Sequence, residues 1–177
     1  MILVSGSKIV HKKIWNYISK LYLVHRGKIV VIDAVNKFDP YLISEISLVH
    51  GVTPYEVLDN IIVARSFTPF QLIKLLEQVE SFHGLPLICL GINNLFEDEN
   101  IPEVYAWKLF KKVVNKIKSF TMITILTADN SVANRNFIPF IENHSSVLIK
   151  ENRVLKPKIR NGEKSLWEGQ LHLLARF

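Results

Sequence analysis

The sequence has a single cysteine and lacks any apolar run long enough to cross a membrane. Cys89 lies inside the apolar run 85–92, so no disulfide can form within one chain, and such a thiol is typical of a buried core residue. That run is far shorter than the about 20 residues that a membrane helix needs. The N-terminus also lacks the basic start and cleavage site of a signal peptide. These absences predict a cytoplasmic protein that needs no membrane.

Acidic residues are absent from residues 1–32, which contain six lysines and arginines. Residues 150–177 carry seven Lys and Arg against three Glu, whereas the middle of the chain is net acidic. Two basic ends on an acidic body favour a surface that contacts a polyanion such as nucleic acid, although ordinary solvated lysines explain the same counts. The six histidines show no metal-ligand spacing, so we expect no metal.

Short apolar runs alternate with amphipathic segments of helical length, which is typical of an α/β fold. The pattern predicts strands at residues 2–5, 28–33, 60–64, 86–92 and 122–127. It predicts helices at residues 7–25, 40–50, 68–82 and 102–119, with a further helix that begins at Thr53-Pro54. Beyond residue 145 it predicts only strands, at 146–150, 152–158 and 166–174. We therefore expect a mainly parallel sheet flanked by helices, with antiparallel C-terminal strands.

The predicted helix at 102–119 has two contrasting sides. Its apolar residues are expected to face the core: Val104, Trp107, Phe110, Val113, Val114 and Ile117. Its lysines are expected mostly on the outer side: Lys108, Lys111, Lys112, Lys116 and Lys118.

Three segments of the chain are the most informative. Residues 31–40 read Val-Ile-Asp-Ala-Val-Asn-Lys-Phe-Asp-Pro, and residues 144–148 read His-Ser-Ser-Val-Leu. The most specific segment, residues 51–67, reads Gly-Val-Thr-Pro-Tyr-Glu-Val-Leu-Asp-Asn-Ile-Ile-Val-Ala-Arg-Ser-Phe. Together they resemble the ATPase core of the RecA/RadA recombinases, and the similarity spans about residues 2–160. It implies a RecA-like fold, with residues 1–177 as a single core domain and no N-terminal DNA-binding domain.

The residues that handle phosphate in that family are altered here. A phosphate-binding loop needs Gly-x-x-x-x-Gly-Lys-Ser/Thr between the first strand and the first helix. This chain has only Gly6, Ser7 and Lys8 in a shorter loop, with Ile9 in place of the hydroxyl residue. Those three residues are either a vestigial nucleotide site or a helix cap followed by a surface lysine.

The carboxylates that the family uses for hydrolysis are also replaced. Val35 stands where the resemblance implies the acid that activates water, and Gly91 where it implies the aspartate that supports magnesium. Asp33 remains at a strand end, with no nucleophile, metal partner or base near it in the sequence. We therefore expect no ATPase activity, no catalytic residue and no cofactor.

The resemblance favours a non-catalytic RadA/RecA-like paralogue that acts as an accessory factor in homologous recombination and DNA repair. It would bind DNA, a RadA-like recombinase or paralogue, or both, and it could dimerise. Non-specific phosphate contacts are expected from Lys156, Lys158, Arg160 and Lys164, unless these residues only solvate an edge strand. Two alternatives stay open: a regulatory domain that senses a nucleotide or another anion near residues 5–8, and a pure protein-interaction scaffold on the same fold.

Overall fold

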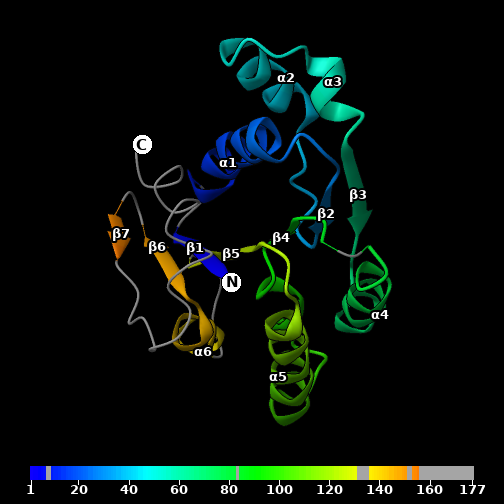
Figure 1. The fold of residues 1–177 in the computed structure, drawn as a ribbon. Coiled ribbons are helices and arrows are strands. Elements are labelled where there is room, and N and C mark those ends of the chain that lie inside the picture. The colour runs from blue at the N-terminus through cyan, green and yellow to red at the C-terminus, as the bar shows by residue number, and fades with distance from the viewer. Residues whose placement is uncertain (7–8, 83, 131–135, 151–152, 156–177) are drawn as a thin grey trace.

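The computed structural model describes residues 1–6, 9–82, 84–130, 136–150 and 153–155, and their side chains except those of 9–13 and 153–155. Within these ranges a seven-stranded sheet separates two layers of helices (Figure 1). No helix in this part of the chain is both long and apolar enough to span a bilayer.

The sheet is almost entirely parallel. Strands β1 to β6 pair with one another in parallel, and β7 pairs antiparallel with β6. In spatial order the strands are β3 (Ile61–Arg65), β2 (Ile29–Asp33), β4 (Leu87–Leu90), β5 (Thr124–Asp129), β1 (Ile2–Gly6), β6 (Val147–Lys150) and β7 (Arg153–Leu155). The four central strands are buried on both faces, which explains their near-continuous apolar sequences. The expected α/β class is confirmed, and the sheet is consistent with a RecA-like fold.

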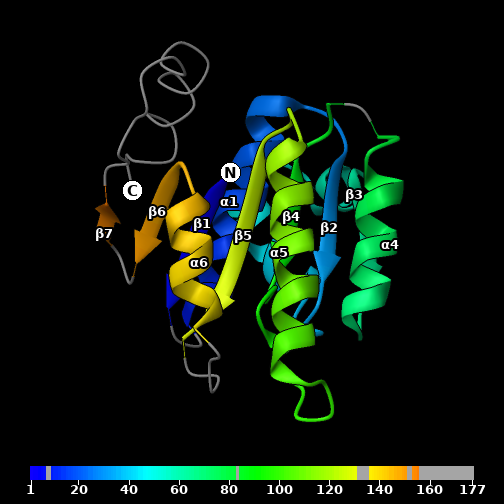
Figure 2. The same ribbon diagram turned by 90° about the horizontal axis from the view of Figure 1, so that it is seen from below.

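Each face of the sheet carries its own hydrophobic core. One core is covered by α1 (Ile9–His25), with α2 (Pro40–Val49) and α3 (Pro54–Leu58) packed beyond it. The other lies under α4 (Pro69–Val79), α5 (Glu103–Ser119), α6 (Phe137–His144) and the short 3₁₀ helix η1 (Asn94–Phe96). Figure 2 shows α4, α5 and α6 side by side across this second face.

Three helices begin at side-chain caps, of which the sequence predicted the one at Thr53. The cap side chain accepts a hydrogen bond from the third helical N–H at 3.0–3.4 Å in α2, α3 and α4, and a proline follows each cap. The caps are Asp39, Thr53 and Thr68. These caps fix where the chain turns back over the sheet after β2 and β3.

The C-terminal region differs from expectation in two ways. Strand β6 pairs in parallel with β1, so among the strands described here β7 alone runs antiparallel. Helix α6 precedes β6, and the apolar pattern did not indicate it. The strand expected at 166–174 lies outside the described residues.

The expected inner side of α5 is correct except at its first turn. Phe110, Val113, Val114 and Ile117 are buried, and Trp107 is half-buried, whereas Val104 is 86% exposed. Val104 lies six residues before Phe110, which turns it about 120° away from the buried side of a regular helix. Ala106, four residues before Phe110, takes the core position instead.

Candidate functional site

The candidate site lies at the edge where the parallel strands end. Strands β2, β4, β5 and β1 are neighbours in the sheet and point the same way, so their C-terminal residues meet along one edge (Figure 2). Ligand sites of open α/β sheets gather at this edge. It brings together Asp33, Val35, Gly91, Thr127 and Gly6.

Asp33 is 1% exposed, and its carboxylate organises the loop after β2. Its Oδ1 accepts hydrogen bonds from the backbone N–H groups of Val35 and Lys37, both at 3.1 Å. Its Oδ2 accepts one from the N–H of Phe38 at 2.8 Å. Buried carboxylates need such partners, and here the backbone supplies them. The strand-end acid that the sequence singled out therefore has a structural role in shaping the loop.

That loop places Val35 directly over Gly91. A methyl group built on Gly91 would lie 2.1 Å from Cγ1 of Val35, below the 3.0 Å that real side chains keep. Gly91 also has a φ of +63°, a conformation that glycine adopts without steric cost. Its N–H donates to the buried Oγ1 of Thr127 at 2.8 Å. The two positions where the resemblance implies carboxylates are thus in contact with each other.

The ends of β4, β5 and β1 are joined by a second set of hydrogen bonds. Buried Asn93 donates through Nδ2 to the Asp129 carbonyl at 3.2 Å and accepts from the Asp129 N–H at 3.1 Å. The N–H of Asn130 donates to the carbonyl of Gly6 at 3.0 Å. Sequence reasoning missed Asn93, although a polar residue directly after the apolar run 85–92 was a usable signal.

The described part of this edge does not fit a magnesium-bound nucleotide. In the ranges that the structure describes, no group of three His, Cys, Asp or Glu side chains could hold a metal ion. The Asp33 carboxylate is engaged by backbone, and Val35 offers an apolar surface where a metal-bound water would need an acceptor. The residues present form packing contacts and internal hydrogen bonds.

Few of the predicted site residues fall within the described ranges. Gly6 is the buried last residue of β1, while Ser7 and Lys8 lie outside them. The four predicted phosphate-contacting residues, Lys156, Lys158, Arg160 and Lys164, also lie outside. On β4, burial raises the pKa of the Cys89 thiol to about 12, in line with the expected core residue.

A family model of Rad51 matches residues 18–84. The match begins within α1, covers its C-terminal part from residue 18, and runs through β2, α2, α3, β3 and α4. It contains residues 31–40 and 51–67, two of the three segments that carry the resemblance, and also Val35. This similarity supports a relationship to the RecA/Rad51-like recombinases and suggests a function related to recombination or repair. No curated protein matches the chain.

Proposed function

We propose that this chain is a non-catalytic Rad51-like paralogue that acts as an accessory factor in homologous recombination or DNA repair. It works in the cytoplasm by binding DNA, a recombinase, or both. The Rad51 match and the mainly parallel sheet support the family part of the proposal. The contact between Val35 and Gly91 is the observation that carries the non-catalytic part.

Hydrolysis of a nucleotide needs groups that orient the attacking water and hold magnesium. Val35 has no lone pair to accept a proton, and its methyl groups fill the space into which a side chain at position 91 would project. Restoring an acid at one of the two positions alone would leave the other altered. A retained fold with this apolar contact fits a protein whose role is binding.

One observation favours the alternative of a nucleotide- or anion-sensing domain. The Ser5 hydroxyl is buried in β1 just before α1, and it has no hydrogen-bond partner among the described residues. Helix N-termini attract anions, so a bound anion near residues 5–8 would use both features. This reading predicts a rise in melting temperature with nucleotide or phosphate and no effect on recombination.

Strand exchange by the recombinase of the same organism tests the proposal. The purified chain is added at increasing ratios to that recombinase, and joint-molecule formation is followed over time. We expect a dose-dependent change in rate and co-elution with the recombinase or with DNA. An unrelated basic protein of equal net charge controls for charge alone. No change in the rate of strand exchange would overturn the recombination role, and no co-elution with either DNA or the recombinase would overturn the binding role. A nucleotide-dependent shift in melting temperature without either effect would favour the sensing domain.

A further inference from the structure

Helix α5 carries an unusual concentration of positive charge. Its five lysines fall within eleven residues: Lys108, Lys111, Lys112, Lys116 and Lys118. No acidic residue occurs anywhere from residue 104 to residue 128. The helix lies on the outside of the sheet between α4 and α6 (Figure 1). One side of α5 therefore forms part of the outer surface of that layer.

Four of these lysines lie along one strip of the helix, the α5 lysine face, with Asn115 in the interval before the last of them: Lys108, Lys111, Lys112 and Lys118. At 100° per residue they occupy an arc of about 120°, opposite the side that packs on the sheet. All four are exposed. The strip is about 15 Å long, because ten residues separate its ends at 1.5 Å each.

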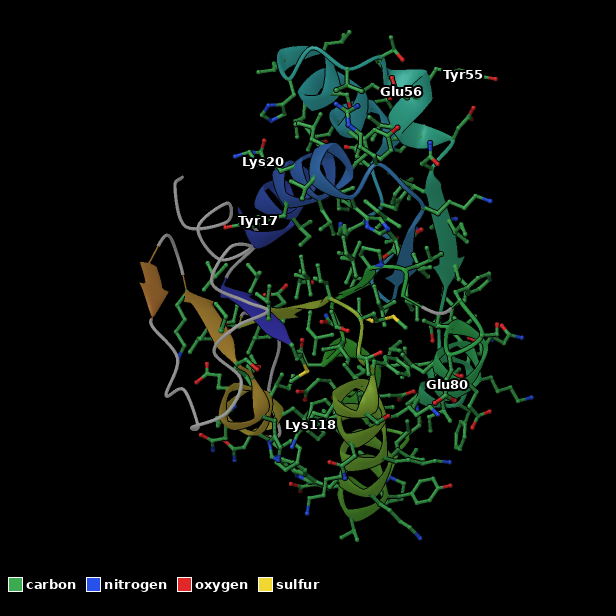
Figure 3. The ribbon with its side chains drawn as sticks, viewed as in Figure 1. Tyr17, Lys20, Tyr55, Glu56, Glu80 and Lys118 are labelled. Atoms are coloured by element: carbon green, nitrogen blue, oxygen red, sulfur yellow. The ribbon has the colours of Figure 1, made fainter. Side chains whose placement is uncertain are left out.

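The α5 lysine face borders a groove that Lys112 lines together with Glu77 of α4. Lys116, outside the strip, is paired with Oε2 of Glu80 on the α4 side at 2.6 Å. Figure 3 shows Lys118 on the side of α5 away from Glu80. Within the part of the chain that the structure describes, no lysine of the strip forms an ion pair, and the Lys111 ammonium lies 5.7 Å from the Trp107 ring centroid. The strip is therefore a local excess of positive charge.

Helix stability alone does not account for this arrangement. Lysines in the last turn interact favourably with the helix dipole, which explains Lys116 and Lys118. Lys108, Lys111 and Lys112 lie further from the C-terminus, and like charges three or four residues apart destabilise a helix. A bound polyanion would relieve this repulsion.

We propose that the α5 lysine face binds the phosphate backbone of nucleic acid. Interfacial helices insert large apolar side chains along the length of their basic face. On α5 the exposed large apolar side chains are confined to the first turn, at Val104 and Tyr105, and none is exposed between Lys108 and Lys118, so a membrane surface fits less well. The helix contains no arginine, and lysines act as point charges on phosphate, so binding is independent of sequence. This assignment names the surface that would carry the DNA binding of the proposed function. It rests on the positions and charges of the α5 lysines and does not depend on the similarity to Rad51.

The test measures binding of the full chain to short labelled oligonucleotides by fluorescence anisotropy across a salt series. One variant replaces all four lysines of the strip by Gln. The matched control makes the same loss of four charges at scattered exposed positions, with Lys28, Lys37, Arg65 and Lys74 changed to Gln. A third variant changes the four strip lysines to Arg. Circular-dichroism melts verify that each variant folds, and the double variant Lys108→Gln/Lys112→Gln serves if the fourfold one is unstable.

We expect the wild type to bind single-stranded and duplex DNA of any sequence. Four phosphate contacts correspond to roughly a 100-fold loss of affinity between about 50 and 200 mM salt. The strip variant should bind at least about tenfold more weakly, with a log–log salt slope flatter by about 3–4 on duplex. The control should change less than about threefold, and the Arg variant should bind like the wild type.

Several outcomes would overturn the proposal. These are no binding by the wild type, equal weakening of strip and control variants, and binding that depends instead on Lys156, Lys158, Arg160 and Lys164 when these are changed to Ala. Sedimentation with phosphatidylserine vesicles that duplex DNA does not compete away would assign the strip to a membrane. A chain that binds DNA through α5 and leaves strand exchange unchanged would uphold this inference and contradict the recombination role.

Discussion

Val35 and Gly91 follow the ends of different strands, and each restricts which side chain fits at the other position. Gly91 requires glycine both for its φ of +63° and for the 2.1 Å approach of a built methyl group to Val35. Asp33 sets the loop that brings Val35 there, through three backbone hydrogen bonds. At the scale of residues, this edge of the sheet is held together by specific packing that the sequence pattern alone did not reveal.

Gly91→Ala should destabilise the protein more than Gly51→Ala does. Gly51 also has a positive φ, of +69°, but a methyl group there meets no atom within 4 Å. Both substitutions incur about 1–2 kcal/mol for the left-handed conformation, and overpacking at Gly91 adds about 1–3 kcal/mol. Urea unfolding of both variants measures the difference. In a Val35→Ala background, most of the additional destabilisation caused by Gly91→Ala should disappear. Equal losses of unfolding free energy for Gly51→Ala and Gly91→Ala would contradict the contact between Val35 and Gly91.

Asp33→Asn should lower the free energy of unfolding by about 1–3 kcal/mol. The asparagine amide keeps only one acceptor oxygen and replaces the other with an NH₂ donor. In one orientation that donor faces the backbone N–H of Phe38. In the other it faces the N–H groups of Val35 and Lys37, so in both cases two donors oppose each other. Asp39→Asn is the matched control, because asparagine caps a helix about as well as aspartate does. Chemical denaturation compares the two variants. An Asp33→Asn protein as stable as Asp39→Asn would show that the loop does not depend on the carboxylate.

At the scale of elements, strands β1 to β5 and the helices from α1 to α5 follow from the sequence. Parallel strands buried on both faces need continuous apolar runs, and the caps at Thr53 and Thr68 mark helix starts locally. Helix α6 was missed because it has eight residues and contains Pro139, which reads as a turn. The Asn93–Asp129 pair could not be predicted, since it depends on β4 and β5 being neighbours in the sheet.

Val31→Asp should abolish cooperative folding, because it places an unpaired charge in the middle of β2 at a cost of several kcal/mol. Val63→Asp is the control on the edge strand β3, where the side chain is 38% exposed and the charge reaches water. Thermal melts followed by circular dichroism distinguish them. A soluble Val31→Asp protein that melts cooperatively near the wild-type temperature would place β2 elsewhere.

At the scale of the whole molecule, two hydrophobic cores, one on each face, hold the sheet. Each large apolar side chain buried there contributes about 1.5–3 kcal/mol. Folding should therefore need neither nucleotide nor magnesium. The melting temperature should be the same in EDTA as in magnesium-ATP, since a ligand raises it only by binding the folded state. A rise of several degrees with magnesium-ATP would contradict this prediction and favour the sensing domain.

Steady-state ATP hydrolysis by the purified chain, with and without single-stranded DNA, tests the central claim most directly. Neither Val35 nor Gly91 has a side-chain group that could orient water or support magnesium. We predict phosphate release no faster from the wild type than from Lys8→Ala or from buffer. Turnover above that background, lost in Lys8→Ala, would contradict the account of a Rad51-like core retained for binding alone.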